Sequence, residues 1–224
     1  MGREGKIFYG WWIVVATFIV LFAGLCSGFY TVSVFLEPLQ AAFGWTKTQV
    51  SLGFTIAALL VGLLSPVVGI AVAKLGIKKV QLTGALLTGT GLLLLSTIQH
   101  LWQYYAVFIY LAVGLASVGL VPSQTTISYW FVKKRGLAMG IIMTGVGVGG
   151  MAMVFIASQV VAAMDWRWAY RVLGLIVLGL VVPAILLIIK DRPQDMGLVP
   201  DGESAASGAA QSAASGVNFT VGQA

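Results

Sequence analysis

Long apolar runs, separated by short charged or polar segments, dominate the pattern along the chain. An α-helix needs roughly 20 apolar residues to cross the hydrocarbon core of a bilayer, and the part before residue 190 contains six runs of about this length or longer. The uncharged stretch 80–132 is too long for one helix and breaks at the polar segment 99–103, Gln-His-Leu-Trp-Gln. The pattern therefore predicts six membrane-spanning helices, at about 10–36, 48–73, 80–98, 102–128, 136–164 and 168–189.

Positively charged residues concentrate in alternate connections between these runs. If the N-terminus lies in the cytoplasm, the outer segments contain Lys47, Arg167 and Arg171. The inner segments contain the other ten lysines and arginines, which are Arg3, Lys6, Lys74, Lys78, Lys79, Lys133, Lys134, Arg135, Lys190 and Arg192. Because cytoplasmic loops of membrane proteins carry an excess of cations, we expect both termini in the cytoplasm and the chain in the cell membrane. All seven tryptophans fall at span ends, where indole rings favour the membrane interface.

Composition excludes several classes of protein. Apolar residues make up 59% of the chain and charged residues 9%, whereas soluble domains are about 45–50% apolar and about 25% charged. The net charge of +6 comes from short clusters between apolar runs, which favours contact with membrane lipids over nucleic acid. A single cysteine, Cys26, excludes a disulfide framework and a cysteine-rich metal site. We expect a membrane protein without a metal ion or cofactor.

The composition changes after residue 190. The sequence 191–193, Asp-Arg-Pro, ends the last apolar run, because proline cannot continue a helix. From 202 to 216, thirteen of fifteen residues are Gly, Ala or Ser, which is typical of a flexible linker. The chain therefore divides into a cytoplasmic N-terminus (1–9), a six-helix bundle (10–190) and a cytoplasmic linker (191–224). Since a linker normally joins two domains, we expect a truncated chain.

Four short segments carry a family resemblance. Residues 9–14 (Tyr-Gly-Trp-Trp-Ile-Val) open the first span, while 33–39 (Ser-Val-Phe-Leu-Glu-Pro-Leu) and 43–46 (Phe-Gly-Trp-Thr) lie around its outer end. Residues 130–140 (Trp-Phe-Val-Lys-Lys-Arg-Gly-Leu-Ala-Met-Gly) lead into the fifth span. Together with six spans and a cytoplasmic linker, these segments resemble the N-terminal half of a major facilitator superfamily transporter. They are most similar to the bacterial monocarboxylate and oxalate/formate antiporter-like branch.

This resemblance implies a fold and a function. The fold is an all-α membrane bundle of two inverted three-helix repeats, which forms half of a twelve-helix transporter. The function is alternating-access transport of a small solute, with an organic anion such as a monocarboxylate as the expected substrate. The key cationic residues of the resembling family lie in its second half. The implied partner is therefore a missing C-terminal six-helix half or a second chain, and we expect this chain to be inactive alone.

The connection between the second and third spans carries a further motif. The superfamily usually has Gly, three residues, Asp-Arg, one residue, Gly and then basic residues. Here Ala73 replaces the acidic residue, and the positions that fit are Gly69, Lys74, Gly76, Lys78 and Lys79. In the family that carboxylate helps to latch the two halves, so its loss weakens the case for the same latch here. The lysines are then expected to meet anionic lipid headgroups.

Uncharged polar residues are the candidates for contact with the solute. No Asp, Glu, Lys or Arg lies near the middle of a predicted span, so this half offers neither an obvious proton carrier nor a cationic anchor. Ser27, Tyr30 and Thr31 lie together at helical spacing in the first span. Packing between helices is the alternative role for Tyr30, near whose position the resembling eukaryotic monocarboxylate carriers have a lysine. The remaining candidates are Tyr110, Gln124 and Thr144.

Two other classes of six-span protein require residues that this chain lacks. An intramembrane serine protease needs a Gly-x-Ser-x-Gly-type nucleophile and a histidine in a later span, and the single histidine, His100, lies in a predicted outer turn. An aquaporin-type channel needs paired Asn-Pro-Ala segments, and Asn218 is the only asparagine. We therefore predict that the protein is not an enzyme. A non-transporting six-helix scaffold or remnant protein remains the alternative to transport.

Overall fold

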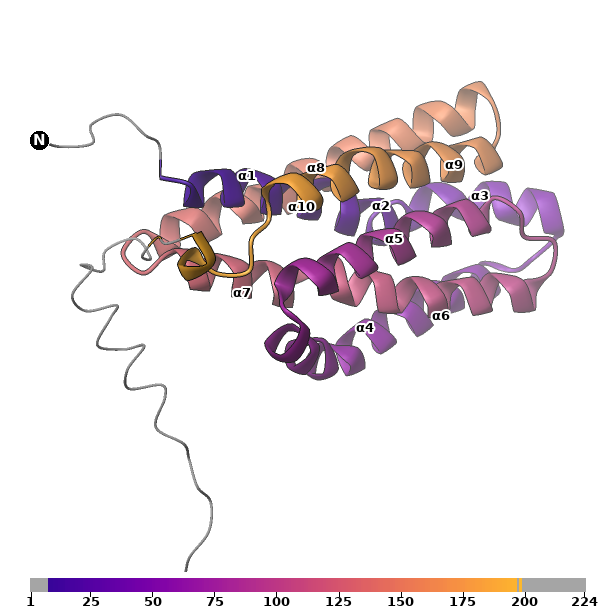
Figure 1. Ribbon diagram of the computed structural model, residues 1–224. Coiled ribbons are helices and arrows are strands. Elements are labelled where there is room, and N and C mark those ends of the chain that lie inside the picture. Colours follow the sequence, from indigo (N-terminus) through magenta and orange to yellow (C-terminus); the bar gives the residue numbers. More distant parts are fainter. Residues whose placement is uncertain (1–7, 197, 199–224) are drawn as a thin grey trace, which may run out of the picture.

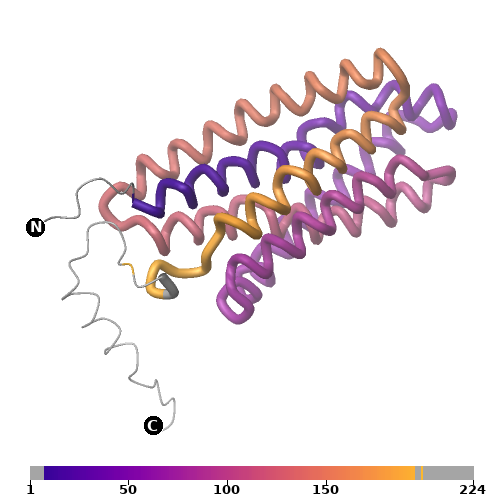
Figure 2. The backbone as a smooth tube through the Cα atoms, turned by 45° about the horizontal axis from the view of Figure 1, so that its top comes forward, coloured from indigo at the N-terminus to yellow at the C-terminus, as the bar shows by residue number. Residues whose placement is uncertain are grey.

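The computed structural model describes residues 8–196 and 198, whose regular secondary structure is helical. Helices that follow one another end to end form six rods, which run side by side in alternating directions (Figures 1 and 2). Rod 1 (Gly10–Phe43) consists of α1 (Gly10–Ile19), the π-helix η1 (Val20–Leu25), α2 (Cys26–Phe29) and α3 (Val32–Phe43). Rods 2 and 3 are α4 (Lys47–Leu75) and α5 (Ile77–Leu95). Rod 4 (Leu101–Trp130) joins α6 (Leu101–Val118) to α7 (Leu120–Trp130), and rod 5 is α8 (Arg135–Ala163). Rod 6 (Trp166–Ile188) consists of α9 (Trp166–Ile176), the π-helix η2 (Val177–Val181) and α10 (Val182–Ile188), and a short 3-10 helix, η3 (Pro193–Met196), follows it.

Each predicted span overlaps one rod, and an all-α membrane bundle is confirmed. In the described part of the chain, five rods are long and apolar enough to cross a membrane, namely rods 1, 2, 4, 5 and 6. α5 is not in this group because Lys78, Lys79 and Gln81 reduce the apolar share of a helix of only 19 residues. Rod 1 extends beyond its predicted end at residue 36. The charge of Glu37 ends the uncharged run but not the helix, which stops at Gly44, where φ is 69°.

The rods correspond in pairs, as two inverted three-helix repeats require. Rods 1 and 4 contain 34 and 30 residues, rods 2 and 5 contain 29 each, and rods 3 and 6 contain 19 and 23. The contacts correspond as well, because α4 packs along α6 just as α8 packs along α1 and η1, while α5 packs on α9. Rods 1 and 4 also share a non-helical break, at residues 30–31 and at residue 119.

Glycines let the backbones of several rods come into direct contact with each other. A Cβ atom added to Gly149 of α8 would lie 2.5 Å from the carbonyl oxygen of Phe22 in η1. Rods 3 and 6 touch reciprocally, since a Cβ atom on Gly174 would lie 2.9 Å from the Gly89 carbonyl oxygen, and one on Gly89 would lie 3.4 Å from that of Gly174. Small residues at such crossings allow apolar membrane helices to gain van der Waals contact with one another.

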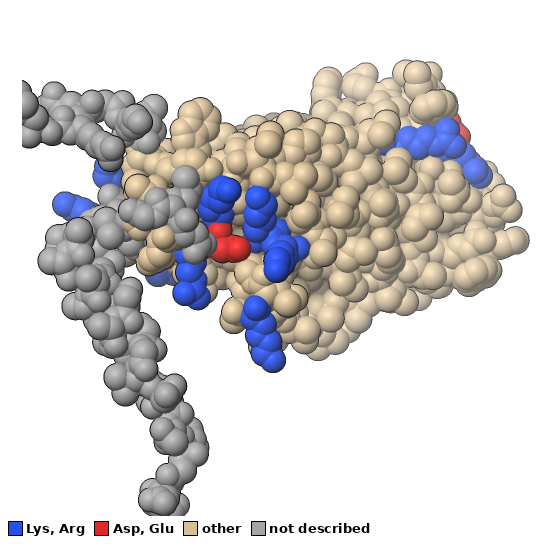
Figure 3. Space-filling view, in the orientation of Figure 1, with Lys and Arg blue, Asp and Glu red and all other residues tan. Residues whose placement is uncertain are grey.

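Charged side chains lie at the two ends of the bundle (Figure 3). One end, called the basic end below, carries eight of the eleven described lysines and arginines, which are Lys74, Lys78, Lys79, Lys133, Lys134, Arg135, Lys190 and Arg192. The opposite end carries Lys47, Arg167 and Arg171, together with Glu37 and Asp165. Between the ends the surface is apolar, and side chains such as Leu63 and Met151 are 65% and 78% exposed. This surface suits contact with lipid tails.

We expect Gly149→Ala to destabilise the bundle, because the added methyl group meets the backbone of η1, which has no rotamer to change. Overpacking of this kind costs about 1–3 kcal/mol. The matched control is Gly147→Ala, on the same helix, where an added Cβ atom has no neighbour within 4 Å. The control should be neutral or slightly stabilising, because alanine favours a helix. Thermal unfolding of the two purified variants measures the difference, and equal midpoints would contradict the packing described here.

Candidate functional site

Two rods lose their regular helix well inside their length. In rod 1, Tyr30 and Thr31 separate α2 from α3, and the Thr31 hydroxyl donates a 2.7 Å hydrogen bond to the Ser27 carbonyl oxygen. In rod 4, Gly119 separates α6 from α7. Irregular backbone at membrane depth is tolerated only where it is buried in protein or lines a water-filled cavity. In a membrane, the two breaks are therefore expected to be covered by protein or to line a water-filled cavity.

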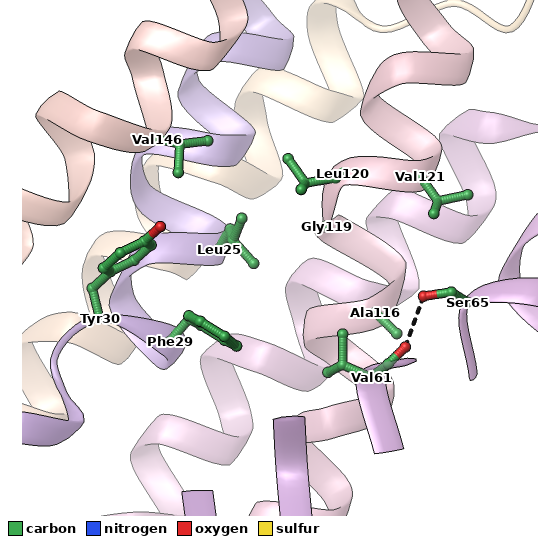
Figure 4. Close-up of a pocket in the computed structure, with 10 residues that line it drawn as sticks. All are labelled: Leu25, Phe29, Tyr30, Val61, Ser65, Ala116, Gly119, Leu120, Val121 and Val146. Atoms are coloured by element: carbon green, nitrogen blue, oxygen red, sulfur yellow. Dashed lines mark hydrogen bonds between the residues drawn. The ribbon is translucent and has the colours of Figure 1, made fainter. Parts of the chain in front are cut away.

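A cavity of about 310 Å³ lies between the two breaks (Figure 4). Rods 1 and 4 face each other across it, and α4 and α8 contribute the remaining side chains. The lining consists of Leu25, Phe29, Tyr30, Val61, Ser65, Ala116, Gly119, Leu120, Val121 and Val146. The cavity thus lies where the two three-helix repeats meet.

Two hydroxyl groups are the polar side-chain groups in this lining. Ser65 Oγ donates to the Val61 carbonyl oxygen at 2.8 Å and is thereby satisfied within α4. The Tyr30 ring packs edge-on against Phe29, with 5.6 Å between ring centroids, and the side chain is 43% exposed. Among the described residues, none with a charge lines the cavity. The arrangement suits a mainly hydrocarbon solute with a polar group that accepts a hydrogen bond from the Tyr30 hydroxyl.

Three of the six predicted solute contacts lie together at the rod 1 break. Tyr30 lines the cavity and also borders a second hollow of about 450 Å³ beside α3 and α4. Ser27 and Thr31 are buried, with exposures of 0% and 1%. The Ser27 hydroxyl has no hydrogen-bond partner in the part of the chain that the structure describes. Of the three, Tyr30 is therefore the side chain best placed to meet a solute.

The other three predicted contacts do not line this cavity. The hydroxyl groups of Tyr110 and Thr90 lie 3.0 Å apart, which ties α6 to α5. Gln124 is exposed on α7. Thr144 is exposed on α8, and its hydroxyl donates to the Ile141 carbonyl oxygen at 2.6 Å. Contact of these residues with a solute stays a prediction.

Sequence patterns do not single out most of the lining, because an apolar residue that faces a cavity looks the same as one that faces lipid. Two signals do mark the place. Gly119 interrupts the apolar run of rod 4, and Ser65 precedes a proline, Pro66, inside α4. Glycine and proline inside membrane helices are tolerated where neighbouring groups satisfy the freed backbone.

The α4–α5 connection is held by a carboxylate from far along the chain. Asp191 Oδ1 accepts a 2.8 Å hydrogen bond from the Lys78 backbone N–H, and Lys78 Nζ donates to the Leu186 carbonyl oxygen at 2.7 Å. Gly76 makes room for this contact, since an added Cβ atom would lie 2.8 Å from Asp191 Oδ2. Although Ala73 replaces the acidic residue of the motif, a carboxylate after rod 6 therefore ties this connection to the rest of the bundle.

The segments at 9–14 and 130–140 meet at the basic end. Tyr9 and Trp130 have ring centroids 5.5 Å apart. The Tyr9 hydroxyl donates to the Ile188 carbonyl oxygen at 2.9 Å, and Trp130 Nε1 donates to the Lys190 carbonyl oxygen at 3.3 Å. Burial raises the pKa of the Tyr9 hydroxyl, which favours the protonated form that donates. These motif residues join the ends of rods 1, 4 and 6.

Comparison with known proteins finds a protein family that this chain matches. A model described as Major Facilitator Superfamily matches residues 13–222. The chain is 26% identical to an MFS-type transporter of Gibberella moniliformis over 196 residues, or 86% of this chain and 45% of the relative. It is 30% identical to monocarboxylate transporter 1 of Rattus norvegicus over 183 residues, which are 80% of this chain and 36% of the relative. It is 31% identical to the fujikurins efflux protein of Gibberella fujikuroi over 144 residues, which are 64% of this chain and 31% of the relative. The chain therefore spans less than half the length of each of these relatives.

We expect Gly76→Ala to destabilise the chain by about 1–3 kcal/mol, because φ of 89° with ψ of 156° is a backbone conformation open essentially only to glycine. The added methyl group would also collide with the Asp191 carboxylate. Gly69→Ala is the matched control, since the other motif glycine is helical and has no atom within 4 Å of an added Cβ. Urea or thermal unfolding in detergent compares the two, and an equal loss of stability in both variants would contradict this assignment.

Proposed function

The chain belongs to the Major Facilitator Superfamily, and we propose that it forms one half of a carrier that moves a small organic anion, such as a monocarboxylate, by alternating access. The observation that carries this proposal is the cavity between the breaks of rods 1 and 4. Relatives named as monocarboxylate transporters support the substrate class. A non-transporting scaffold would need neither broken helices nor a cavity between them, so the same observation favours transport.

The neutral lining suggests how the anion is oriented. The hydrocarbon part of the solute lies against Phe29, Val61 and Leu120, while the Tyr30 hydroxyl donates a hydrogen bond to an oxygen atom of the solute. A buried carboxylate needs a cation or several donors, and none of the lining residues is charged. The second half of the carrier therefore supplies the cation, as the family resemblance implies.

The second half is a further six-helix bundle, in the same polypeptide or in another chain. α4 and α8 contribute to the cavity, and they are also the least covered of the five long apolar rods, with 17% and 28% of their most apolar windows buried. On α8, Gly140 and Gly147 have no neighbour within 4 Å of an added Cβ atom, which leaves room for close approach of another helix. Alternating access needs two bundles that rock about a shared site, so the single bundle does not transport alone.

The basic end faces the cytoplasm, and the chain lies in the cell membrane. Among the described residues, eight lysines and arginines lie at the basic end and three at the opposite end. Cytoplasmic loops of membrane proteins carry such an excess of lysine and arginine. The interfacial tryptophans support the same placement, because Trp12 lies near one end of the bundle and Trp102 and Trp168 near the other, each about half exposed or more.

Cysteine labelling tests this orientation. We expect a membrane-impermeant maleimide added outside intact cells to label Gln99→Cys, at the opposite end, and to label Lys133→Cys, at the basic end, only after the cells are opened. The native thiol of Cys26 is fully buried and gives little background. Labelling of both positions from the same side would contradict the six-rod topology, and the reverse pattern would contradict the orientation.

Uptake measurements test the proposed site. In vesicles that contain the product of the complete reading frame, we expect saturable uptake of a radiolabelled monocarboxylate. Tyr30→Phe should raise KM by about threefold to tenfold, because it removes one hydrogen bond worth about 0.5–1.5 kcal/mol. Tyr110→Phe is the comparison variant, since its hydroxyl contacts Thr90 rather than the cavity.

Three outcomes of the uptake experiment are decisive. A normal KM for Tyr30→Phe with a raised KM for Tyr110→Phe would place the site near α5 and contradict the cavity as the binding site. Uptake restricted to cations or sugars would contradict the substrate class. Saturable uptake by vesicles that hold residues 1–224 alone would contradict the need for a second bundle.

A further inference from the structure

A groove of about 240 Å³ opens between α4 and α5 near the basic end, away from the cavity described above. α4 and α5 each pack on α6 far more extensively than on each other, so α6 forms the floor of the groove. Leu75 and Val67 on α4 are 59% and 58% exposed, and Val113 on α6 is 43% exposed. An apolar groove is thus left uncovered between α4 and α5.

The hydroxyl groups in the groove already have hydrogen-bond partners. The Thr83 hydroxyl donates to the carbonyl oxygens of Lys79 and Val80, at 3.0 Å and 2.9 Å. The Ser117 hydroxyl donates to the Val113 carbonyl oxygen at 2.9 Å. The groove therefore offers a polar solute or a peptide no free side-chain hydroxyl, and its wall suits a hydrocarbon chain.

Two exposed lysines lie in or next to the lining of this groove. Lys79 is exposed and belongs to the lining, and Lys74 is exposed one residue before Leu75. Lys78 is already used, because its ammonium group donates to the Leu186 carbonyl oxygen. No acidic residue lines the groove in the described part of the chain, and Asp191 accepts from the Lys78 backbone N–H. An apolar groove with one lysine in its lining, and a second lysine next to a lining residue, matches a molecule with a long hydrocarbon chain and an anionic head.

We propose that this groove is a specific site for an anionic phospholipid of the leaflet at the basic end. One acyl chain lies between α4 and α5 on the floor of α6, and the headgroup phosphate contacts Lys79 and Lys74. An anionic phospholipid matches both features of the site, the apolar wall and the lysines. A zwitterionic lipid of the same chain length lacks the net negative charge, and a free soluble anion lacks the hydrocarbon chain. Basic residues at the membrane surface attract anionic headgroups with about 1 kcal/mol each, which corresponds to about a fivefold change in occupancy for each lysine.

Photo-crosslinking in phosphatidylcholine nanodiscs tests this proposal. The full chain is reconstituted in three parallel samples, each with a trace of one lipid that carries a diazirine in its acyl chain. The three lipids are phosphatidylglycerol, phosphatidylcholine and oleate. Mass spectrometry then locates the labelled peptides. We expect phosphatidylglycerol to label α4 between residues 64 and 75 and the facing parts of α5 and α6, well above the other two lipids.

Charge variants complete the experiment. Lys79→Gln and Lys74→Gln should each lower phosphatidylglycerol labelling of the groove by about fivefold and leave phosphatidylcholine labelling unchanged. Lys133→Gln is the matched control, because it removes one positive charge from the same end at an exposed turn outside the groove. Thermal unfolding confirms that the variants stay folded.

The opposite results would overturn the proposal. Equal labelling of the groove by phosphatidylglycerol and phosphatidylcholine would mean ordinary lipid contact, and labelling by oleate at the level of phosphatidylglycerol would mean a fatty-acid site. An equal loss with Lys133→Gln would mean a general effect of surface charge. Labelling confined to segments outside α4, α5 and α6 would rule out the groove.

Discussion

Close backbone contact at glycine is the interaction on which this bundle depends. Lipid tails are as apolar as leucine, so membrane helices gain nothing by hiding apolar side chains and must gain from contact with one another instead. Gly149 brings α8 against the backbone of η1, and the pair Gly89 and Gly174 brings rod 3 against rod 6. Gly28 lets rod 1 pack closely on the Leu115 side chain of rod 4, which would lie 2.8 Å from an added Cβ atom. Of these contacts, the one at Gly28 sets how closely rods 1 and 4 approach each other.

The helix breaks of rods 1 and 4 lie beside the cavity between these rods. A break in a membrane helix leaves backbone groups without partners, which is costly in lipid. Here the breaks at Tyr30 and Gly119 face a cavity between rods 1 and 4, and the Thr31 hydroxyl satisfies one freed carbonyl group. The resulting cavity has an apolar wall and no charge among its lining residues. In the proposed carrier this wall orients the hydrocarbon part of a solute and leaves recognition of its charge to the other half.

Much of the fold could be predicted from the sequence, because a bilayer requires long apolar runs and puts charges and tryptophans at their ends. The positions of the rods and the capping box of Thr46 and Gln49 at the start of α4 follow from local patterns of this kind. Contacts between distant segments do not. Nothing near Gly76 in the sequence indicates that Asp191 reaches the α4–α5 connection, and nothing near Tyr110 indicates that its hydroxyl meets Thr90. Tyr30 is a candidate contact from the sequence because polar residues are rare in these spans, whereas the apolar lining of the cavity carries no such signal.

The central claim is that the solute lies between the breaks of rods 1 and 4. A structure of the complete protein in lipid nanodiscs with its transported solute bound tests this claim most directly. We expect solute density against Tyr30, Phe29 and Leu120, with the charged group of the solute directed toward the second bundle. Density at any site that does not touch these residues, or no second bundle opposite α4 and α8, would contradict it.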